Sequence, residues 1–191
     1  QLENLLKENE IDLRTLFEAG VHFGHPTRKW NPKMNNFIFT KKSKSHVIDL
    51  EKTLDQLKKA RNLLVEILSN GGQCMMVGTK LQASATIKEE AVRSESLYVN
   101  QRWLGGMLTN FSTMKSRVDT LKTIESTVSE ADSKTNTKKE LQVLATKAKK
   151  LKKFFGCLVG IEKLPEVIFL VDTEMEINAV NEAKKLGIPI I

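Results

Sequence analysis

The chain contains Cys74-Met75-Met76-Val77-Gly78-Thr79-Lys80, an apolar run that ends in a turn. A short run in which every side chain is apolar is typical of a strand that is covered on both faces of a sheet. Two more runs of this kind follow, Leu97-Tyr98-Val99 and Glu166-Val167-Ile168-Phe169-Leu170-Val171, and amphipathic segments lie between the runs. This alternation predicts an α/β fold in which a parallel sheet is flanked by helices.

Helices are predicted where apolar residues recur at steps of three and four. Before the first buried strand, a helix is predicted over 2–19 with a break near Glu10, and Asp12 is placed to cap its second part. Gly187 is expected to end the last helix. The remaining predicted helices run from a cap at Asp49 or Thr53 to about Ser69, over 83–94 and over 178–186.

Two regions outside these helices have weaker patterns. A loop is predicted over 20–34, followed by the short strands Phe37-Ile38-Phe39 and Val47-Ile48, which a lysine-rich turn joins. Near the other end, a strand is expected to begin at Ile188 and to stop at Ile191. A doubly wound sheet normally continues past such a point, so the sequence is interpreted as truncated at its C-terminal end.

The segment 111–155 has a different pattern, a heptad repeat on two helices. A polar break at 130–137 separates the two runs, which predicts an antiparallel coiled-coil hairpin. The hairpin is expected to be inserted at 111–155 into an α/β domain made of 1–110 and 156–191. Its apolar positions are Met114, Val118, Leu121, Ile124 and Val128, then Leu141, Leu144, Ala148, Leu151 and Phe155.

Length and charge restrict the class of protein. With 191 residues and 40% hydrophobic content, the chain suits one domain with an appendage. Its 30 basic and 23 acidic side chains give a net charge of +7, which favours a nucleic acid as partner over an anionic membrane surface. No apolar run approaches the roughly twenty residues of a membrane span, and the N-terminus shows no secretory or transit pattern. Cys74 and Cys157, the two cysteines, are interpreted as buried reduced thiols.

The basic side chains are concentrated in one stretch. No Asp or Glu occurs from Ala19 to Val47, a stretch that also contains two prolines and several aromatic residues. A carboxylate would repel phosphates there, so the composition indicates a surface that lies against a polyanion. The predicted RNA-contacting residues of this stretch are Arg28, Lys29, Trp30, Lys33, Lys41, Lys42 and Lys44.

Three alternative chemistries are disfavoured. His22, His25 and the distant His46 lack a recognisable metal-ligand spacing, so no metal site is predicted. The segment 71–80 lacks the phosphate-loop pattern, because Thr79 separates the glycine from the lysine. No spacing singles out a nucleophile with its base, so no catalytic residue and no cofactor are predicted.

Polar residues that follow two of the strands allow two interpretations. Lys80, in a turn after a strand, is predicted to reach a backbone phosphate of RNA. Asp172 lies at the carboxyl end of another strand, where active sites gather in α/β sheets, but an aspartate that caps the next helix is favoured. An enzyme or nucleotide-binding switch that uses Lys80 and Asp172 is therefore the competing class.

A second cluster lies at the start of the predicted hairpin, in Asn100-Gln101-Arg102-Trp103-Leu104-Gly105-Gly106. Arg102 is predicted to contact phosphate, and Trp103 either stacks on RNA or anchors its loop. The lysines of 147–153 are either a second basic surface or a solvated helix face. A scaffold that binds only proteins through the hairpin is a third class.

Taken together, several long blocks resemble the small-subunit ribosomal protein two family of the bacterial and organellar type. They span nearly the whole chain and occur in the family's order. The blocks are Ala19 to His25, Arg28 to Met34, Ile48 to Leu54, Val77 to Lys80, Val99 to Gly106, Leu108 to Phe111, Leu164-Pro165 and Val171 to Thr173.

The resemblance implies a flavodoxin-like α/β domain with a protruding coiled-coil hairpin, in a protein that is not an enzyme. It implies a structural role in the small ribosomal subunit, between head and body. The expected partners are 16S-type ribosomal RNA, neighbouring ribosomal proteins and, in bacteria, ribosomal protein one. It places the protein on ribosomes of the bacterial cytoplasm or of an organelle, with no membrane and no small-molecule substrate.

The chain departs from the family pattern at three places. Leu81 stands where the family commonly has a second lysine, so one expected charge is lost. The stretch 155–161 is more apolar than the family's glycine-rich loop, which puts an RNA contact there in doubt. The family's final block, with a second Asp-Thr pair and a terminal helix, is not found before Ile191.

Overall fold

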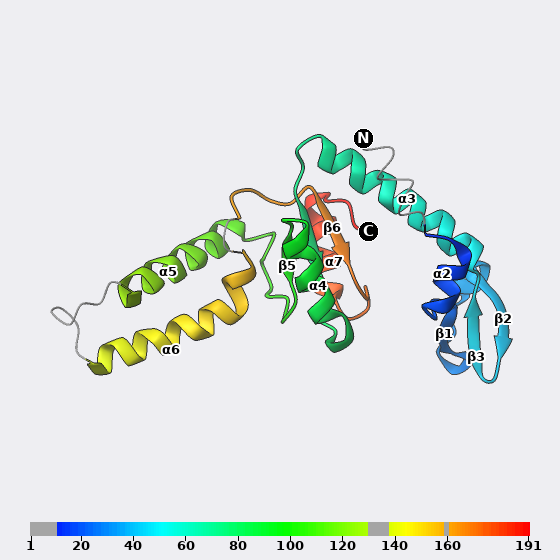
Figure 1. Cartoon of the computed structure of the whole chain (residues 1–191), viewed down its shortest axis with the longest axis horizontal. Coiled ribbons are helices and arrows are strands. Elements are labelled where there is room, and N and C mark those ends of the chain that lie inside the picture. The colour runs from blue at the N-terminus through cyan, green and yellow to red at the C-terminus, as the bar shows by residue number, and fades with distance from the viewer. Residues whose placement is uncertain (1–10, 130–137, 159–160) are drawn as a thin grey trace. The chain divides into compact units, whose positions relative to one another are not determined.

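The computed structural model describes residues 11–129, 138–158 and 161–191. It contains two compact units, 1–65 and 66–191, which are described separately (Figure 1). The helix predicted over 2–10 and the polar break at 130–137 lie outside the described residues.

The first unit is built around a small antiparallel sheet with the strand order β1-β3-β2. A short helix, α2 (Leu13–Glu18), precedes it, and the long helix α3 (Leu50–Ser69) begins after it. Two 3-10 turns lie between the first two strands. The elements between the helices are β1 (Phe23–Pro26), η1 (Thr27–Lys29), η2 (Pro32–Phe37), β2 (Ile38–Lys42) and β3 (Ser45–Ile48).

The prediction of a continuous loop over 20–34 was wrong, because β1 lies inside it. β1 pairs with β3, with Phe23 opposite Val47 and Pro26 opposite Ser45. Pro26 is compatible with the edge of a sheet, where a missing N–H leaves no partner unpaired. The pairing partner is some twenty residues away in the sequence, so no local pattern announced it. The predicted hairpin of β2 and β3 is confirmed, with strands that extend into the lysine-rich segment.

Two predicted caps of this unit are confirmed. Asp12 accepts a hydrogen bond at 2.7 Å from the backbone N–H of Thr15 at the start of α2. Asp49, one of the two candidates for α3, accepts from the N–H of Glu51 at 3.1 Å. Thr53 instead donates its hydroxyl to the Asp49 carbonyl oxygen, so the helix begins at Leu50 rather than after Thr53.

The second unit contains the predicted parallel sheet. Its strands are β4 (Cys74–Val77), β5 (Leu97–Val99) and β6 (Val167–Leu170), in the order β5-β4-β6. Ile190 extends this order through a parallel bridge to Ile168 of β6. The helices α4 (Leu81–Arg93) and α7 (Ile177–Leu186) flank the sheet. The fold class is therefore mixed α/β, as predicted.

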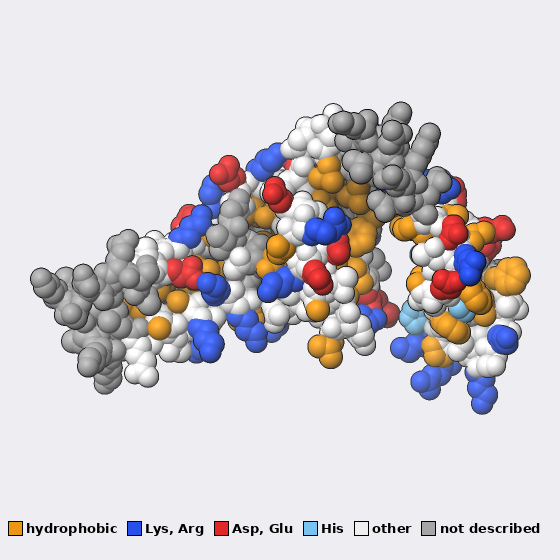
Figure 2. Space-filling view, in the orientation of Figure 1, with side chains coloured by type: hydrophobic (Ala, Val, Ile, Leu, Met, Phe, Trp, Pro, Cys, Tyr) orange, Lys and Arg blue, Asp and Glu red, His pale blue; other side chains and the backbone are white. Residues whose placement is uncertain are grey.

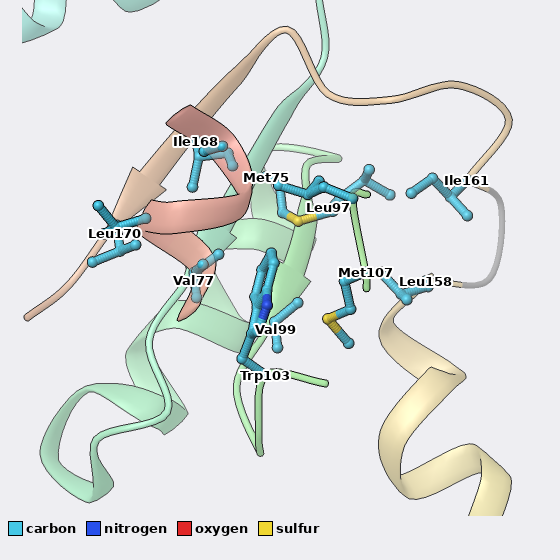
Figure 3. Packing of buried hydrophobic residues seen from close by; sticks show 14 of the residues in the cluster. Met75, Val77, Leu97, Val99, Trp103, Met107, Leu158, Ile161, Ile168 and Leu170 are labelled. Atoms are coloured by element: carbon cyan, nitrogen blue, oxygen red, sulfur yellow. The ribbon is translucent and has the colours of Figure 1, made fainter. Parts of the chain in front are cut away.

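The core of this unit lies against the sheet. Met75 and Val77 of β4, Val99 of β5 and Ile168 of β6 are almost completely buried, and Figure 3 shows them packed near Trp103. The end of β4 approaches α4 closely: a Cβ atom at Gly78 would lie 2.8 Å from a side-chain carbon of Ile87. Gly187 ends α7 in a left-handed conformation, with φ at 69°, as predicted.

Two further helices, α5 (Phe111–Ser129) and α6 (Lys138–Phe155), pack against each other. Val118, Leu121 and Ile124 of α5 are buried, which agrees with the predicted apolar face. Lys152 of α6 forms an ion pair with Glu125 of α5 at 2.8 Å. A short turn, η3 (Gly156–Leu158), follows α6 and places the buried Leu158 in the core of the sheet. Among the described helices, none is long and apolar enough to span a membrane.

Candidate nucleic-acid interface

Six basic side chains of the 1–65 unit form a surface that we call the cationic flank. All six are exposed, and none of them has an ion-pair partner among residues 11–129, 138–158 and 161–191. Figure 2 shows basic side chains along this part of the chain. The members of the flank are Arg28, Lys29, Lys33, Lys41, Lys42 and Lys44.

The small sheet brings the two halves of the cationic flank together. Pro26 of β1 lies opposite Ser45 of β3, and the N–H of Thr27 donates to the Lys44 carbonyl oxygen at 2.9 Å. The 3-10 turn that carries Arg28 and Lys29 is thereby placed beside the β2–β3 turn. Cations fifteen residues apart in the sequence therefore share one surface, which is what a phosphate backbone requires of its partner.

The β2–β3 turn has an uncommon backbone for its residue types. Ser43 and Lys44 have φ angles of 49° and 65°, the left-handed conformation that a two-residue hairpin turn needs at both positions. Asparagine and glycine are the usual residues there. The geometry turns the chain sharply and leaves Lys42 and Lys44 exposed at the tip.

Exposed aromatic rings lie among these cations. Phe23 and Phe39 are 71% and 75% exposed, and Trp30 is 47% exposed. Flat exposed rings beside basic groups can stack on unpaired bases. Trp30 was predicted as a site residue and is accessible for that role. Phe23 and Phe39 were not singled out, although aromatic residues interleaved with lysines in an acid-free stretch are a signal that points to them.

The histidines of this unit have structural surroundings. His22 stacks on Phe17 with 4.4 Å between ring centroids, and His46 is only 4% exposed. Both ring nitrogens of His46 lack a hydrogen-bond partner among the described residues. The described residues contain no group of three His, Cys, Asp or Glu side chains that could hold a metal ion.

At the carboxyl edge of the parallel sheet, polar groups pair with one another. Lys80 forms an ion pair with Asp172 at 2.9 Å, and this hydrogen bond, followed by one from the Met175 N–H, lowers the pKa of the aspartate. The Thr79 N–H donates to the buried carboxylate of Glu176 at 3.0 Å. The backbone donor of the Gly-Thr-Lys turn is thus already used, and Lys80 is partly neutralised.

The interpretation of Asp172 as a cap of the following helix needs correction. The N-cap of α7 is Glu176, four residues later, and Asp172 accepts instead from Lys80 and from the Met175 N–H within the preceding turn. Asp172 has a φ angle of 72°, which aspartate tolerates better than most residues. Its position in a tight turn rather than at the helix start explains the different partner.

A carboxylate that the sequence did not reveal organises the loop after β5. Glu182 of α7 accepts from the Trp103 Nε1–H at 3.0 Å and from the Gly106 N–H at 2.8 Å. It also accepts from the Leu108 N–H at 3.0 Å, and from the N–H and hydroxyl of Thr109 at 3.1 Å. Partial burial raises the pKa of Glu182, but these hydrogen bonds outweigh burial and lower it overall.

This arrangement decides between the two interpretations of Trp103. The indole is 7% exposed and packs in the core, so in this structure it anchors the loop. Arg102, the neighbouring residue, is exposed and remains accessible to phosphate. The loop is therefore a fixed platform that presents Arg102.

The molecule combines an exposed cationic surface with a sheet edge whose polar groups pair with one another. These features define a basic scaffold protein that binds a polyanion.

Comparison with known proteins identifies the family. The family model for ribosomal protein S2 matches residues 16–191. The chain is 46% identical over 183 residues to the small ribosomal subunit protein uS2 of Geotalea uraniireducens (strain Rf4), a match that covers 96% of this chain and 72% of the relative. The chain belongs to the ribosomal protein S2 family.

Membership confirms the resemblance drawn from the sequence blocks. The chain is a structural constituent of the small ribosomal subunit, it acts in translation, and it is not an enzyme. Its place is the ribosome, and its partners are ribosomal RNA and other ribosomal proteins. The competing interpretation of Lys80 and Asp172 as groups of an enzyme has no support.

Proposed function

We propose that the cationic flank binds the phosphate backbone of 16S-type ribosomal RNA between the head and the body of the small subunit. The observation that carries this proposal is the set of six exposed cations without ion-pair partners, joined into one surface by the β1–β3 pairing. Phosphate contacts fix position without reading sequence, so selectivity comes from the shape of the RNA. Trp30 adds a ring that stacks on an accessible base.

Two predicted contacts have supporting roles in this proposal. Arg102 reaches phosphate from the loop that Glu182 holds. Lys80 contributes less than the flank, because Asp172 already compensates its charge. Trp103 contributes by anchoring the loop rather than by stacking.

The finer architecture belongs to the same proposal. The order β5-β4-β6, extended by Ile190 beside β6, is the order of a flavodoxin-like sheet. α5 and α6 form the two arms of a coiled-coil hairpin inserted at 111–155, supported by the buried positions Val118, Leu121 and Ile124. The hairpin contacts neighbouring ribosomal proteins, and in bacteria the protein helps to hold ribosomal protein one.

The test is the salt dependence of binding to small-subunit ribosomal RNA. In Lys41→Gln/Lys42→Gln, two phosphate contacts are removed, and Lys44 stays unchanged because of its left-handed backbone. The slope of log affinity against log salt should flatten by about 1.4 to 1.8, at roughly 0.7 to 0.9 for each contact.

The matched control is Lys184→Gln/Lys185→Gln, which removes two exposed lysines from the last turn of α7. It loses the same charge and should keep a slope close to that of the wild type. An equal change of slope in both variants would show that net charge, and not the flank, controls binding.

A further inference from the structure

We propose that a cleft between α4, the end of β5 and the end of α6 is a second phosphate site, which takes backbone phosphates of ribosomal RNA. This inference rests on the proposed function and adds a contact surface within the 66–191 unit. The cleft has a volume of about 460 Å³. Its polar lining residues are Lys88, Tyr98, Asn100, Gln101, Lys152 and Lys153.

The lining has the chemistry of an anion site. Three lysines from two helices converge on the cleft, and among the described residues that line it none is acidic. Lysine binds phosphate as a point charge, and the side-chain amides of Asn100 and Gln101 can donate N–H groups to phosphate oxygens. Glu125 compensates one of the lysines, so an excess of two positive charges remains.

Several lining side chains are held in place by neighbours. Asn100 donates its amide N–H to the Ser84 carbonyl oxygen of α4 at 3.2 Å, which fixes it at the carboxyl end of β5. Lys88 lies four residues after Ser84 and hence on the same side of α4. Lys152 is oriented by its 2.8 Å ion pair with Glu125. Because these groups are ordered before a ligand arrives, binding loses less conformational entropy.

The helix dipole explains part of this charge but not all of it. Lys152 and Lys153 occupy the last turn of α6, where cations stabilise the negative end of a helix. The same argument does not apply to Lys88, which lies in the middle of α4. A stabilising role at the helix end also gives no reason for two amide side chains to face the same cleft.

The open form of the cleft favours a phosphate that belongs to a polymer. A free anion in an open, wet cleft is held only by screened charges. A phosphate of RNA that is already bound at the cationic flank reaches the cleft at a high effective concentration, so the same weak contacts become useful. We therefore assign the cleft to RNA backbone and not to a free phosphate metabolite.

The experiment uses the full chain with Lys88→Gln/Lys152→Gln/Lys153→Gln. Binding to small-subunit ribosomal RNA is measured over a series of salt concentrations, and circular dichroism checks the fold. With two uncompensated charges lost from the site, the slope of log affinity against log salt should fall by about 1.5, and affinity at moderate salt roughly tenfold.

The matched control is Lys147→Gln/Lys149→Gln/Lys150→Gln, which removes three exposed lysines from the same helix outside the cleft. Its slope should change by less than half as much. Equal losses in the two variants would overturn the cleft and leave the proposed function intact, as long as Lys41→Gln/Lys42→Gln still weakens binding. A wild-type chain that fails to bind this RNA would overturn both.

Two further measurements complete the test. Lys88→Gln alone serves if the triple variant does not fold, and it should flatten the slope by about 0.7, whereas no change would count against the site. Titration with inorganic pyrophosphate separates the two sources of phosphate. Micromolar, saturable binding that disappears in the cleft variant while RNA affinity is unchanged would overturn the assignment to RNA.

Discussion

Replacing the carboxylate of Glu182 should unfasten the loop that presents Arg102. Five hydrogen bonds converge on its two oxygens, four of them from backbone or indole N–H groups. In Glu182→Gln, one oxygen remains as an acceptor, and the new NH2 group faces donors. Two N–H groups therefore lose their partner whichever way the amide turns.

The expected size of the effect follows from which donors are buried. The Trp103 side chain and Leu108 are buried, whereas Thr109 is exposed and can bond to water. A buried donor without a partner costs about 1–3 kcal/mol, so Glu182→Gln should lower the free energy of unfolding by about 2–4 kcal/mol. Glu174→Gln, an exposed acid just before α7, is the control and should change stability by about 0.5 kcal/mol or less.

Urea unfolding followed by tryptophan fluorescence measures this difference. The chain has two tryptophans, so a Trp30→Phe background isolates the signal of Trp103. If Glu182→Gln unfolds within about 0.5 kcal/mol of its parent, the carboxylate does not hold the loop and the argument fails.

The same pair of proteins should respond to acid with a defined sign. The pKa of Glu182 is lower in the folded chain than its ordinary value of 4.5, because the hydrogen bonds of the loop outweigh burial. The charged form is therefore bound more tightly in the folded state, and its contribution is complete above pH 4.5 and lost as the pH falls through the folded pKa. The stability gap between the parent and Glu182→Gln should narrow over that range, and a gap that widens in acid would contradict the assignment.

Three other changes test features of the 66–191 unit. Asp172→Asn keeps a residue that tolerates the left-handed backbone but removes the ion pair with Lys80, so it should cost about 1 kcal/mol or less in urea unfolding, since the pair is partly exposed. Gly78→Ala would place a Cβ atom 2.8 Å from an isoleucine side chain and should cost about 1–3 kcal/mol, and an unchanged midpoint would show that α4 shifts freely. Burial raises the pKa of the Cys74 thiol to about 11, so in a Cys157→Ser background a thiol reagent at pH 8 should react with Cys74 only after unfolding, and fast labelling of the folded chain would show an open sheet edge.

The sequence predicted the parallel sheet because its strands carry a signal that needs no partner. A run such as Cys74 to Val77 is apolar at every position, which only a doubly covered strand tolerates in a soluble fold. The capping aspartates Asp12 and Asp49 were equally local, since their partners lie within three residues. The apolar face of α5 followed from its spacing alone.

The parts that sequence reasoning missed depend on distant partners. Glu182 binds groups 73 to 79 residues away, and nothing in the pattern of α7 distinguishes it from a solvated acid. Lys80 meets Asp172 across 92 residues, so its loss of free charge was equally invisible. β1 was taken for loop because only its pairing with β3 makes it a strand. The cationic flank, in contrast, was predicted from an acid-free composition, and its geometry awaits the binding tests.

The position of β4 in the middle of its sheet also has a consequence for how the protein is made. One side of β4 pairs with β5, which follows soon after it, but the other side pairs with β6, beginning at Val167 opposite Cys74. During synthesis the ribosome must therefore add all of α5 and α6 before β4 finds its second neighbour. Throughout that interval, the nascent chain carries an apolar strand with one bare edge, which is a site for chaperone capture or for wrong association.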